Sequence, residues 1–171
     1  MSKDNKIYLA PHNPDWAKKF EIEKGLIEET IGSYITGGIH HVGSTAIPEM
    51  SAKPIIDIMV GVKSLEETKP CIELLKKISY CYFPYKTEQM HWFCKPSEEH
   101  RTHHLYLIET TNPEFNARLA FRDYLINNSE EASEYEKLKQ GLIDKFSDDR
   151  EAYTQAKTDF IRQTVNKALN L

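Results

Sequence analysis

The chain has 171 residues, of which 40% are hydrophobic, and it carries a formal net charge of −4 at pH 7. This length allows one domain with a substantial core, whereas two domains of half the length would each be marginal. The acidic balance argues against general nucleic-acid binding, because neutralising phosphates needs concentrated Lys and Arg. We expect a single domain over residues 1–171, with a sheet-containing core (1–112) and C-terminal helices packed on it (113–171).

The cysteines and the N-terminal residues bear on location. Cys71, Cys81 and Cys94 form an odd count at wide spacings, which fits a reducing compartment better than a disulfide framework. The N-terminal residues hold no apolar stretch after their charges, and no segment approaches the roughly 18 apolar residues of a membrane-spanning helix. The sequence therefore predicts a cytoplasmic protein without a membrane partner.

The first part of the chain alternates strand and helix patterns. Asn13 or Asp15 can cap a helix whose apolar residues, from Trp16 to Ile31, recur at a spacing of three to four. A nearly uninterrupted apolar run around Asp57 predicts a buried strand. In this part we expect strands at 6–9, 38–42 and 54–60, and helices at 16–31 and 69–78.

The second part changes from strands to helices at about Pro113. Aromatic residues at 80–83 and 90–94 predict two strands that can pair as a hairpin, and 102–109 predicts a further strand. We expect the remaining residues to form helices at 114–127, 129–146 and 149–171. The order of elements predicts an α+β fold in which a mixed sheet has flanking helices and a C-terminal helical layer.

A turn of small residues precedes the predicted Asp57 strand. Gly43, Ser44 and Thr45 can offer backbone N–H groups and hydroxyls to a ligand, and Lys53 adds a cation. A plain loop is the alternative for the turn. Asp57 either faces this turn from an adjacent strand or is satisfied by backbone N–H groups or an internal Arg or Lys. The spacing favours an anion held beside an acidic group.

The strand predicted at 102–109 carries histidines on both faces. Residues 104, 106 and 108 share one face, so if the leucines of the other face pack under helices, His104 and Tyr106 look toward a cleft. The histidine and cysteine spacings match no common zinc pattern. One imidazole is instead a candidate for phosphate binding or proton transfer, and Arg101 strengthens that interpretation.

Arg122 is a further candidate ligand for an anion, because its helix directly follows the His104 strand. Arg122 and Asp123 point about 100° apart on a helix, so both cannot face one site squarely. The alternative is a core helix whose Phe121 and Leu125 are buried while the charged neighbours face water.

Together these motifs resemble the GrpB family, which is grouped with the nucleotidyltransferase superfamily. The resemblance covers nearly the whole chain and rests on the segments 13–16, 41–48, 53–58, 101–105, 121–125 and 153–168. It implies a nucleotidyltransferase-like fold.

The resemblance also implies roles for particular residues. Gly43 and Ser44 would hold a triphosphate, and Asp57 would be the first carboxylate ligand of Mg²⁺ or Mn²⁺, with no organic cofactor. The superfamily places a second acid two residues later, where this chain has Met59. Either Asp57 and His104 hold one metal and act in catalysis, or the pocket only binds a phosphorylated ligand, through Ser44, Lys53, Arg101 and His104.

Two functions follow from these alternatives. The first is metal-dependent transfer of a nucleotidyl group from a nucleoside triphosphate to a small acceptor. The second is non-catalytic binding of a nucleotide or phosphorylated metabolite in the same pocket. In both, the partner is a small phosphorylated molecule rather than a nucleic acid or a membrane.

Overall fold

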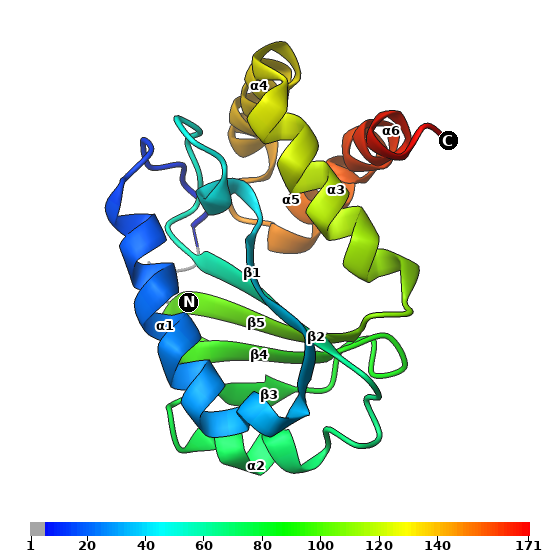
Figure 1. Cartoon of the computed structure of the whole chain (residues 1–171). Helices are drawn as coiled ribbons and strands as arrows, with labels where there is room; N and C mark the ends of the chain where they lie inside the picture. The colour runs from blue at the N-terminus through cyan, green and yellow to red at the C-terminus, as the bar shows by residue number, and fades with distance from the viewer. Residues whose placement is uncertain (1–5) are drawn as a thin grey trace.

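A five-stranded sheet forms the centre of the protein (Figure 1). The computed structural model describes residues 6–171. The strand order is β1-β2-β5-β4-β3, in which β2 and β5 run parallel and the other neighbours are antiparallel. The strands are β1 (Ile35–Val42), β2 (Ile56–Val62), β3 (Cys81–Phe83), β4 (His91–Pro96) and β5 (Arg101–Glu109). The mixed α+β class and the β3–β4 hairpin are confirmed.

Helices cover the sheet and extend beyond it at one end. They are α1 (Asp15–Ile31), α2 (Pro70–Lys76), α3 (Pro113–Asn127), α4 (Ser129–Phe146), α5 (Arg150–Ala156) and α6 (Thr158–Leu169), with 3-10 turns η2 (Gly32–Tyr34) and η3 (Ser44–Ala46). The Asn13 side chain accepts a hydrogen bond from the Asp15 N–H at 2.9 Å, as the capping pattern predicts. Asn112 and Asp149 cap α3 and α5 in the same way.

The prediction of a strand at residues 6–9 is wrong. Only an isolated bridge forms nearby, where Ala10 and Ala52 exchange two backbone hydrogen bonds. The Ile7 N–H donates instead to the Ser147 carbonyl at 2.7 Å. Because Ala52 lies in a loop before β2, no neighbouring strand continues the ladder.

The last predicted helix, 149–171, is two helices that meet at Lys157. No Gly or Pro marks this break in the sequence. The two helices belong to different clusters: Tyr153 of α5 packs with Ile7 and Leu142, whereas α6 packs against the cluster that contains Phe121. The different packing partners account for the break.

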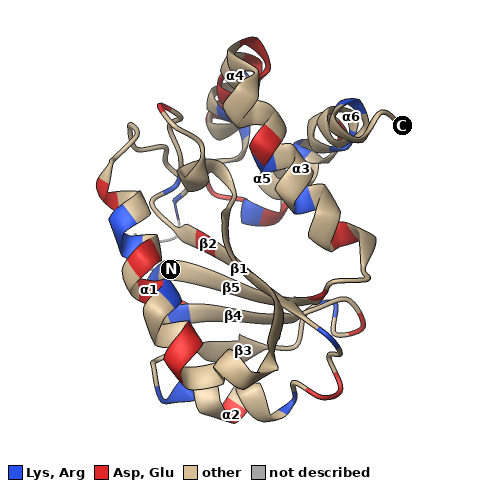
Figure 2. Ribbon diagram, viewed as in Figure 1, with Lys and Arg blue, Asp and Glu red and all other residues tan. Residues whose placement is uncertain are grey.

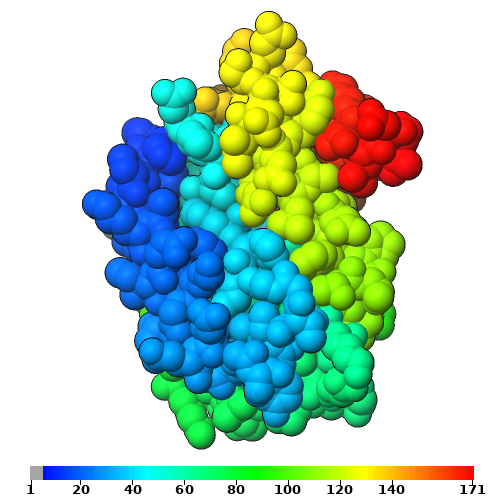
Figure 3. Space-filling model, viewed as in Figure 1, coloured from blue at the N-terminus to red at the C-terminus, as the bar shows by residue number. Residues whose placement is uncertain are grey.

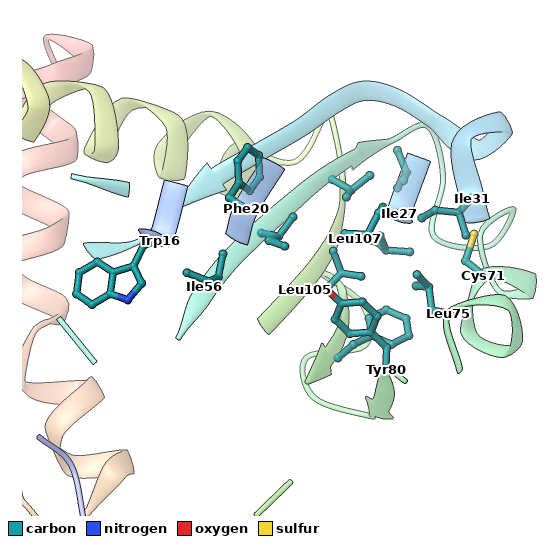
Figure 4. Packing of buried hydrophobic residues seen from close by; sticks show 14 of the residues in the cluster. Trp16, Phe20, Ile27, Ile31, Ile56, Cys71, Leu75, Tyr80, Leu105 and Leu107 are labelled. Carbon is teal, nitrogen blue, oxygen red and sulfur yellow. The ribbon is translucent and has the colours of Figure 1, made fainter. Parts of the chain in front are cut away.

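The larger core lies between the sheet and the helices α1 and α2 (Figure 4). Alternate residues of β2 and β5 point into it, including Ile58, Leu105 and Leu107, each fully buried. Burying a side chain of this size stabilises the fold by about 1.5–3 kcal/mol. The expected packing of the Leu105 face under helices is therefore confirmed, which leaves His104 and Tyr106 on the opposite face.

Helix α3 covers part of that opposite face. Phe115 packs there with Val42, Met59 and Ile108. In the space-filling view (Figure 3), helix α1, in blue, and the C-terminal helices, in yellow and red, flank the chain around residues 40–50, in cyan. Within residues 6–171, every helix is too short or too polar to cross a membrane.

Candidate functional site

The turn after β1 lies directly against Asp57. Val42 and Asp57 are register partners in the antiparallel β1–β2 pair, which confirms that the chain returns as an adjacent strand. Gly43 has φ +73° and ψ −175°, a region occupied almost only by glycine. A Cβ atom at this position would lie 2.5 Å from Asp57 Oδ2. Glycine is thus required both by the backbone and by the neighbouring carboxylate.

Two side chains of β5 hold the Asp57 carboxylate. His104 Nδ1 lies 3.1 Å from Asp57 Oδ1, and the Tyr106 hydroxyl donates to the same oxygen at 3.2 Å. Since a carboxylate accepts only, His104 carries its proton on Nδ1, and its Nε2 is buried without a protein partner among residues 6–171. Figure 2 shows this acidic position of β2 in a sheet that is otherwise almost uncharged.

Asp57 is ionised at neutral pH. Burial alone would raise the pKa of its carboxyl, but the hydrogen bond and charge of His104, together with the charges of Lys53 and Arg118, hold that pKa below its ordinary value. The carboxylate stabilises the fold above its unfolded pKa, and this contribution is lost as the pH falls through the folded value.

Three lysines from different elements converge beside Asp57. Lys53 precedes β2, Lys139 lies on α4, and Lys157 lies at the junction of α5 and α6. The ammonium groups of Lys53 and Lys157 lie 5.3 and 4.4 Å from the centre of the Tyr153 ring. Among residues 6–171, none of the three lysines forms a salt bridge with a carboxylate. They form a group of cations that the protein leaves without direct acidic partners.

Burial and mutual repulsion depress the basicity of these lysines. Burial, with the charges of Lys53 and Lys139, lowers the pKa of Lys157 to about 7. Burial also lowers the pKa of Lys139 to about 8, an effect that Lys53 increases and Glu136 opposes. The pKa of Lys53 is likewise lowered, chiefly by burial. Binding of an anion beside the three lysines would relieve this repulsion.

Helix α4 fixes the loop that carries Lys53. The Ser51 N–H donates to Glu136 at 2.8 Å, and the Lys139 ammonium donates to the Ser51 carbonyl. Lys139 is 2% exposed. These two bonds position the segment between the turn and β2, and so the approach of Lys53 to the site.

Arg118 of α3 brings a fourth cation to the site. Its guanidinium lies 4.3 Å from the centre of the Tyr106 ring, and its Nε donates to Glu114 at 2.9 Å. The hydroxyl of the same tyrosine contacts Asp57. Arg118 is therefore already paired, in contrast to the three lysines.

These groups line one cavity of about 340 Å³. Gly43, Ser44 and the Asp57 side chain, which is 26% exposed, lie on the side of the sheet. Residues of the C-terminal helices form the rest of the wall, and among them Ile161 and Val165 are apolar. Residues as far apart in sequence as Leu9 and Val165 contribute. The volume lies in the range of small-molecule sites, which combine apolar walls with a few polar groups.

Thr45 has a structural role in the turn. Its hydroxyl lies 2.9 Å from His41 Nε2 and donates to the Ile55 carbonyl at 3.3 Å, and the residue is 4% exposed. His41 stacks on Phe20, and burial lowers the pKa of His41 to about 4, so that its ring is neutral. The Thr45 hydroxyl thus holds the turn in place through its contacts with His41 and Ile55, although Thr45 also borders the cavity.

The two arginines expected to bind an anion lie outside the cavity. Arg101 stacks on Trp92 at 5.2 Å and donates to the Glu98 carbonyl. Arg122 donates to the His41 carbonyl and pairs with Asp123 at 2.7 Å. The cavity-facing arginine is Arg118, one helical turn before Arg122.

The sequence analysis missed Arg118, Lys139 and Lys157. A signal is present, because Lys139 lies between Tyr135 and Leu142 in the apolar stripe of α4. Lys157 likewise falls four residues after Tyr153. A cation within an apolar stripe marks a buried charge, and a buried charge needs a partner.

The residues around Asp57 do not fit a resident divalent cation. Mg²⁺ and Mn²⁺ need several oxygen ligands, and among residues 6–171 no group of three or more His, Cys, Asp or Glu is placed to hold a metal. Met59, at the position of the expected second acid, is fully buried under α3. Lys53 and Arg118 already supply positive charge to Asp57.

Known proteins that resemble this chain share one family. The model of the family described as "GrpB protein" matches residues 6–167. The "Glutamate-rich protein GrpB" of Alkalihalophilus pseudofirmus is 35% identical over 94% of this chain and 95% of its own length. The "UPF0157 protein YqkA" of Bacillus subtilis is 34% identical over 95% of this chain, which spans 47% of that longer protein.

A solved structure shows the same fold. The crystal structure of the conserved protein GrpB from Enterococcus faecalis superposes with a TM-score of 0.87 at 28% sequence identity. The superposition covers 95% of this chain and 98% of the other. The arrangement of sheet and helices described above is therefore shared with a protein whose structure was determined by crystallography.

Proposed function

The chain belongs to the GrpB family, and we propose that its cavity binds a small phosphorylated molecule, either a nucleotide or a phosphorylated metabolite. The observation that carries the proposal is the convergence of Lys53, Lys139 and Lys157, none of which has a carboxylate salt bridge among the described residues. The formal net charge of the whole protein is −4, so the overall charge would not attract an anion and the cavity lysines would have to do so. Charge-assisted hydrogen bonds from ammonium groups to phosphate oxygens are among the stronger polar contacts.

Calorimetric titration and thermal unfolding test this proposal directly. Pyrophosphate and nucleoside triphosphates are expected to bind and to raise the melting temperature without added metal, whereas the uncharged nucleoside is not. The stabilisation grows with ligand concentration, because the ligand binds only the folded state. Absence of binding by every phosphate compound tested, in low-salt buffer, would contradict the proposal.

Binding is expected to depend on pH through the lysines. Since the pKa of Lys157 is about 7 and that of Lys139 about 8, both lose their protons as the pH rises from 7 to 9. Phosphate affinity should therefore fall over this interval. Below it the lysines stay charged, until the phosphate itself takes up a proton near pH 6.

In the ligand-free protein the same lysines make stability rise with pH, whereas phosphate affinity falls. Their folded pKa values lie below the unfolded ones, so the unfolded chain binds more protons between about pH 7 and 10, and the free energy of unfolding rises with pH in that range.

Titrations in buffers of different ionisation enthalpy should show proton uptake on binding near pH 7.5. A Lys157→Met variant should show less uptake; equal uptake in the variant would contradict the assignment to Lys157.

Nucleotidyl transfer is the second candidate. It is favoured by the contact between the Gly43–Ser44 turn and Asp57, an arrangement that resembles the triphosphate turn and first carboxylate of nucleotidyltransferases. Asp57 with His104 would then be the group that acts on the acceptor. Incubation with labelled nucleoside triphosphates, with and without Mg²⁺ or Mn²⁺, tests for this activity.

An Asp57→Asn variant separates the two functions. It is expected to bind pyrophosphate at least as tightly as the wild type, because a negative charge leaves the cavity. Any nucleotidyl transfer by the wild type should instead fall at least a hundredfold. The readouts are calorimetric affinity and turnover, with circular dichroism as the check on folding. Weaker pyrophosphate binding by a folded variant would contradict lysine-based anion binding.

A further inference from the structure

Two of the three cysteines face each other across the β3–β4 hairpin. Cys81 of β3 and Cys94 of β4 are direct register partners in this antiparallel pair. Directly opposite residues of an antiparallel pair project their side chains to the same face, with Cα atoms about 4.5–5.5 Å apart. A disulfide bridges Cα atoms about 4.4–6.8 Å apart, so the backbone already meets this requirement. Both residues are thiols in the structure.

The two thiols differ in access to solvent, and this sets an order of reaction. Cys81 is partly exposed on the short edge strand, and its Sγ donates to the Pro96 carbonyl at 3.4 Å. Cys94 is fully buried. An oxidant from solution therefore reaches Cys81 first, and Cys94 lies where a second, resolving thiol is needed.

The third cysteine is an internal reference. Cys71 lies on α2, fully buried in the core on the opposite face of the sheet. Burial raises the pKa of its thiol to about 11 and also raises that of Cys94, but only Cys94 lies opposite Cys81 in the hairpin. Any oxidation of the native protein that removes two thiols should therefore spare Cys71.

We propose that Cys81 and Cys94 form a reversible disulfide when the protein meets a disulfide oxidant such as oxidised glutathione. The Cys81 thiolate attacks one sulfur of the oxidant and releases one glutathione thiolate. The Cys94 thiolate then attacks the Cys81 sulfur of the mixed disulfide and releases the second. Two protein thiols are oxidised and one glutathione disulfide is reduced to two thiols, and the two protons that the cysteines lose pass through solvent to the glutathione thiolates.

A bond between these two cysteines would lie close to the candidate site. Cys94 is in turn the register partner of His104 on β5, so the bond forms one strand away from the imidazole that contacts Asp57.

Equilibration with mixtures of reduced and oxidised glutathione tests the proposal. After denaturation and alkylation, the oxidised protein is expected to have one free thiol of its three, and a mass lower by two hydrogens. The bond should join tryptic peptide 78–86 to peptide 87–101. Excess reduced glutathione should restore all three thiols.

Variants in which one of the three cysteines is replaced provide the controls. Cys71→Ala should form the same bond, and Cys81→Ser should keep both remaining thiols. Cys94→Ala should stop at a glutathione adduct on Cys81, because the resolving thiol is missing. Cys81→Ser alters a partly exposed position and keeps the test usable if Cys94→Ala does not fold. The proposal would be overturned if the wild type showed three free thiols at every glutathione ratio, a bond to Cys71, or a glutathione adduct on Cys81 that never proceeds to the crosslink.

Discussion

Replacement of Gly43 by alanine is expected to lower the free energy of unfolding by about 3 kcal/mol and to displace the Asp57 carboxylate. Two effects add. A residue with a side chain is strained by about 1–3 kcal/mol at the Gly43 backbone conformation. The new methyl group would also lie 2.5 Å from Asp57 Oδ2, so that either the turn or β2 must shift. Any ligand affinity that depends on Ser44 should fall with it.

Denaturant unfolding of Gly43→Ala beside Gly25→Ala measures this effect. Gly25 lies within α1, and a Cβ atom there meets nothing within 4 Å. Gly25→Ala should therefore stabilise the protein by about 0.5–1 kcal/mol, because alanine favours helix. If the Gly43 variant were as stable as the wild type, the close contact between the turn and Asp57 would be contradicted.

Replacement of Lys53, Lys139 and Lys157 together by methionine is expected to weaken pyrophosphate binding at least a hundredfold. A hydrogen bond to a charged group contributes about 1.5–3 kcal/mol, and each 1.4 kcal/mol is a factor of ten in affinity. Three such bonds are lost, but interactions in one cluster are not additive. The affinity of the triple variant for pyrophosphate should therefore be too weak to detect by calorimetry.

The same triple variant should be at least as stable as the wild type. Methionine fills a similar volume, and its introduction removes the desolvation and mutual repulsion that depress the lysine pKa values. The loss of the Lys139 bond to Ser51 partly offsets this gain. Calorimetric affinity and denaturant unfolding are the two measurements.

Exposed lysines of α4 supply the matched control. Lys137→Met and Lys145→Met, both on the solvent side of that helix, should change neither quantity appreciably. Equal loss of pyrophosphate affinity in this control would assign binding to net charge rather than to the cavity. Strong destabilisation of the triple variant would show that the lysines hold the fold rather than a ligand.

The order and type of most elements could be predicted because each carries a local pattern. The apolar run around Asp57 predicts a buried strand, and the aromatic segments around Tyr82 and Phe93 pair as expected. The local sequence could not show that residues 6–9 form no strand or that the last predicted helix is divided in two. Each depends on what packs against it, namely the loop at Ala52 and the cluster around Tyr153.

The half of the candidate site that lies on the sheet follows from the sequence, and the half on the helices does not. Gly43, Ser44 and Asp57 meet as predicted, because a turn and a returning strand bring them together. Lys139 and Lys157 join them only through the packing of the C-terminal helices, and no local pattern states where those helices dock. For the same reason Arg118 rather than Arg122 faces the cavity.

The cavity wall draws on residues from Leu9 to Val165, and this has a consequence for cooperativity. Segments near chain ends fray more readily than central strands, and each opening of α6 or of the N-terminal segment dismantles part of the wall. A ligand that binds only the intact wall shifts these local openings toward the closed state. Occupancy should thus slow amide exchange at both ends of the chain at once, although the two ends are distant in sequence.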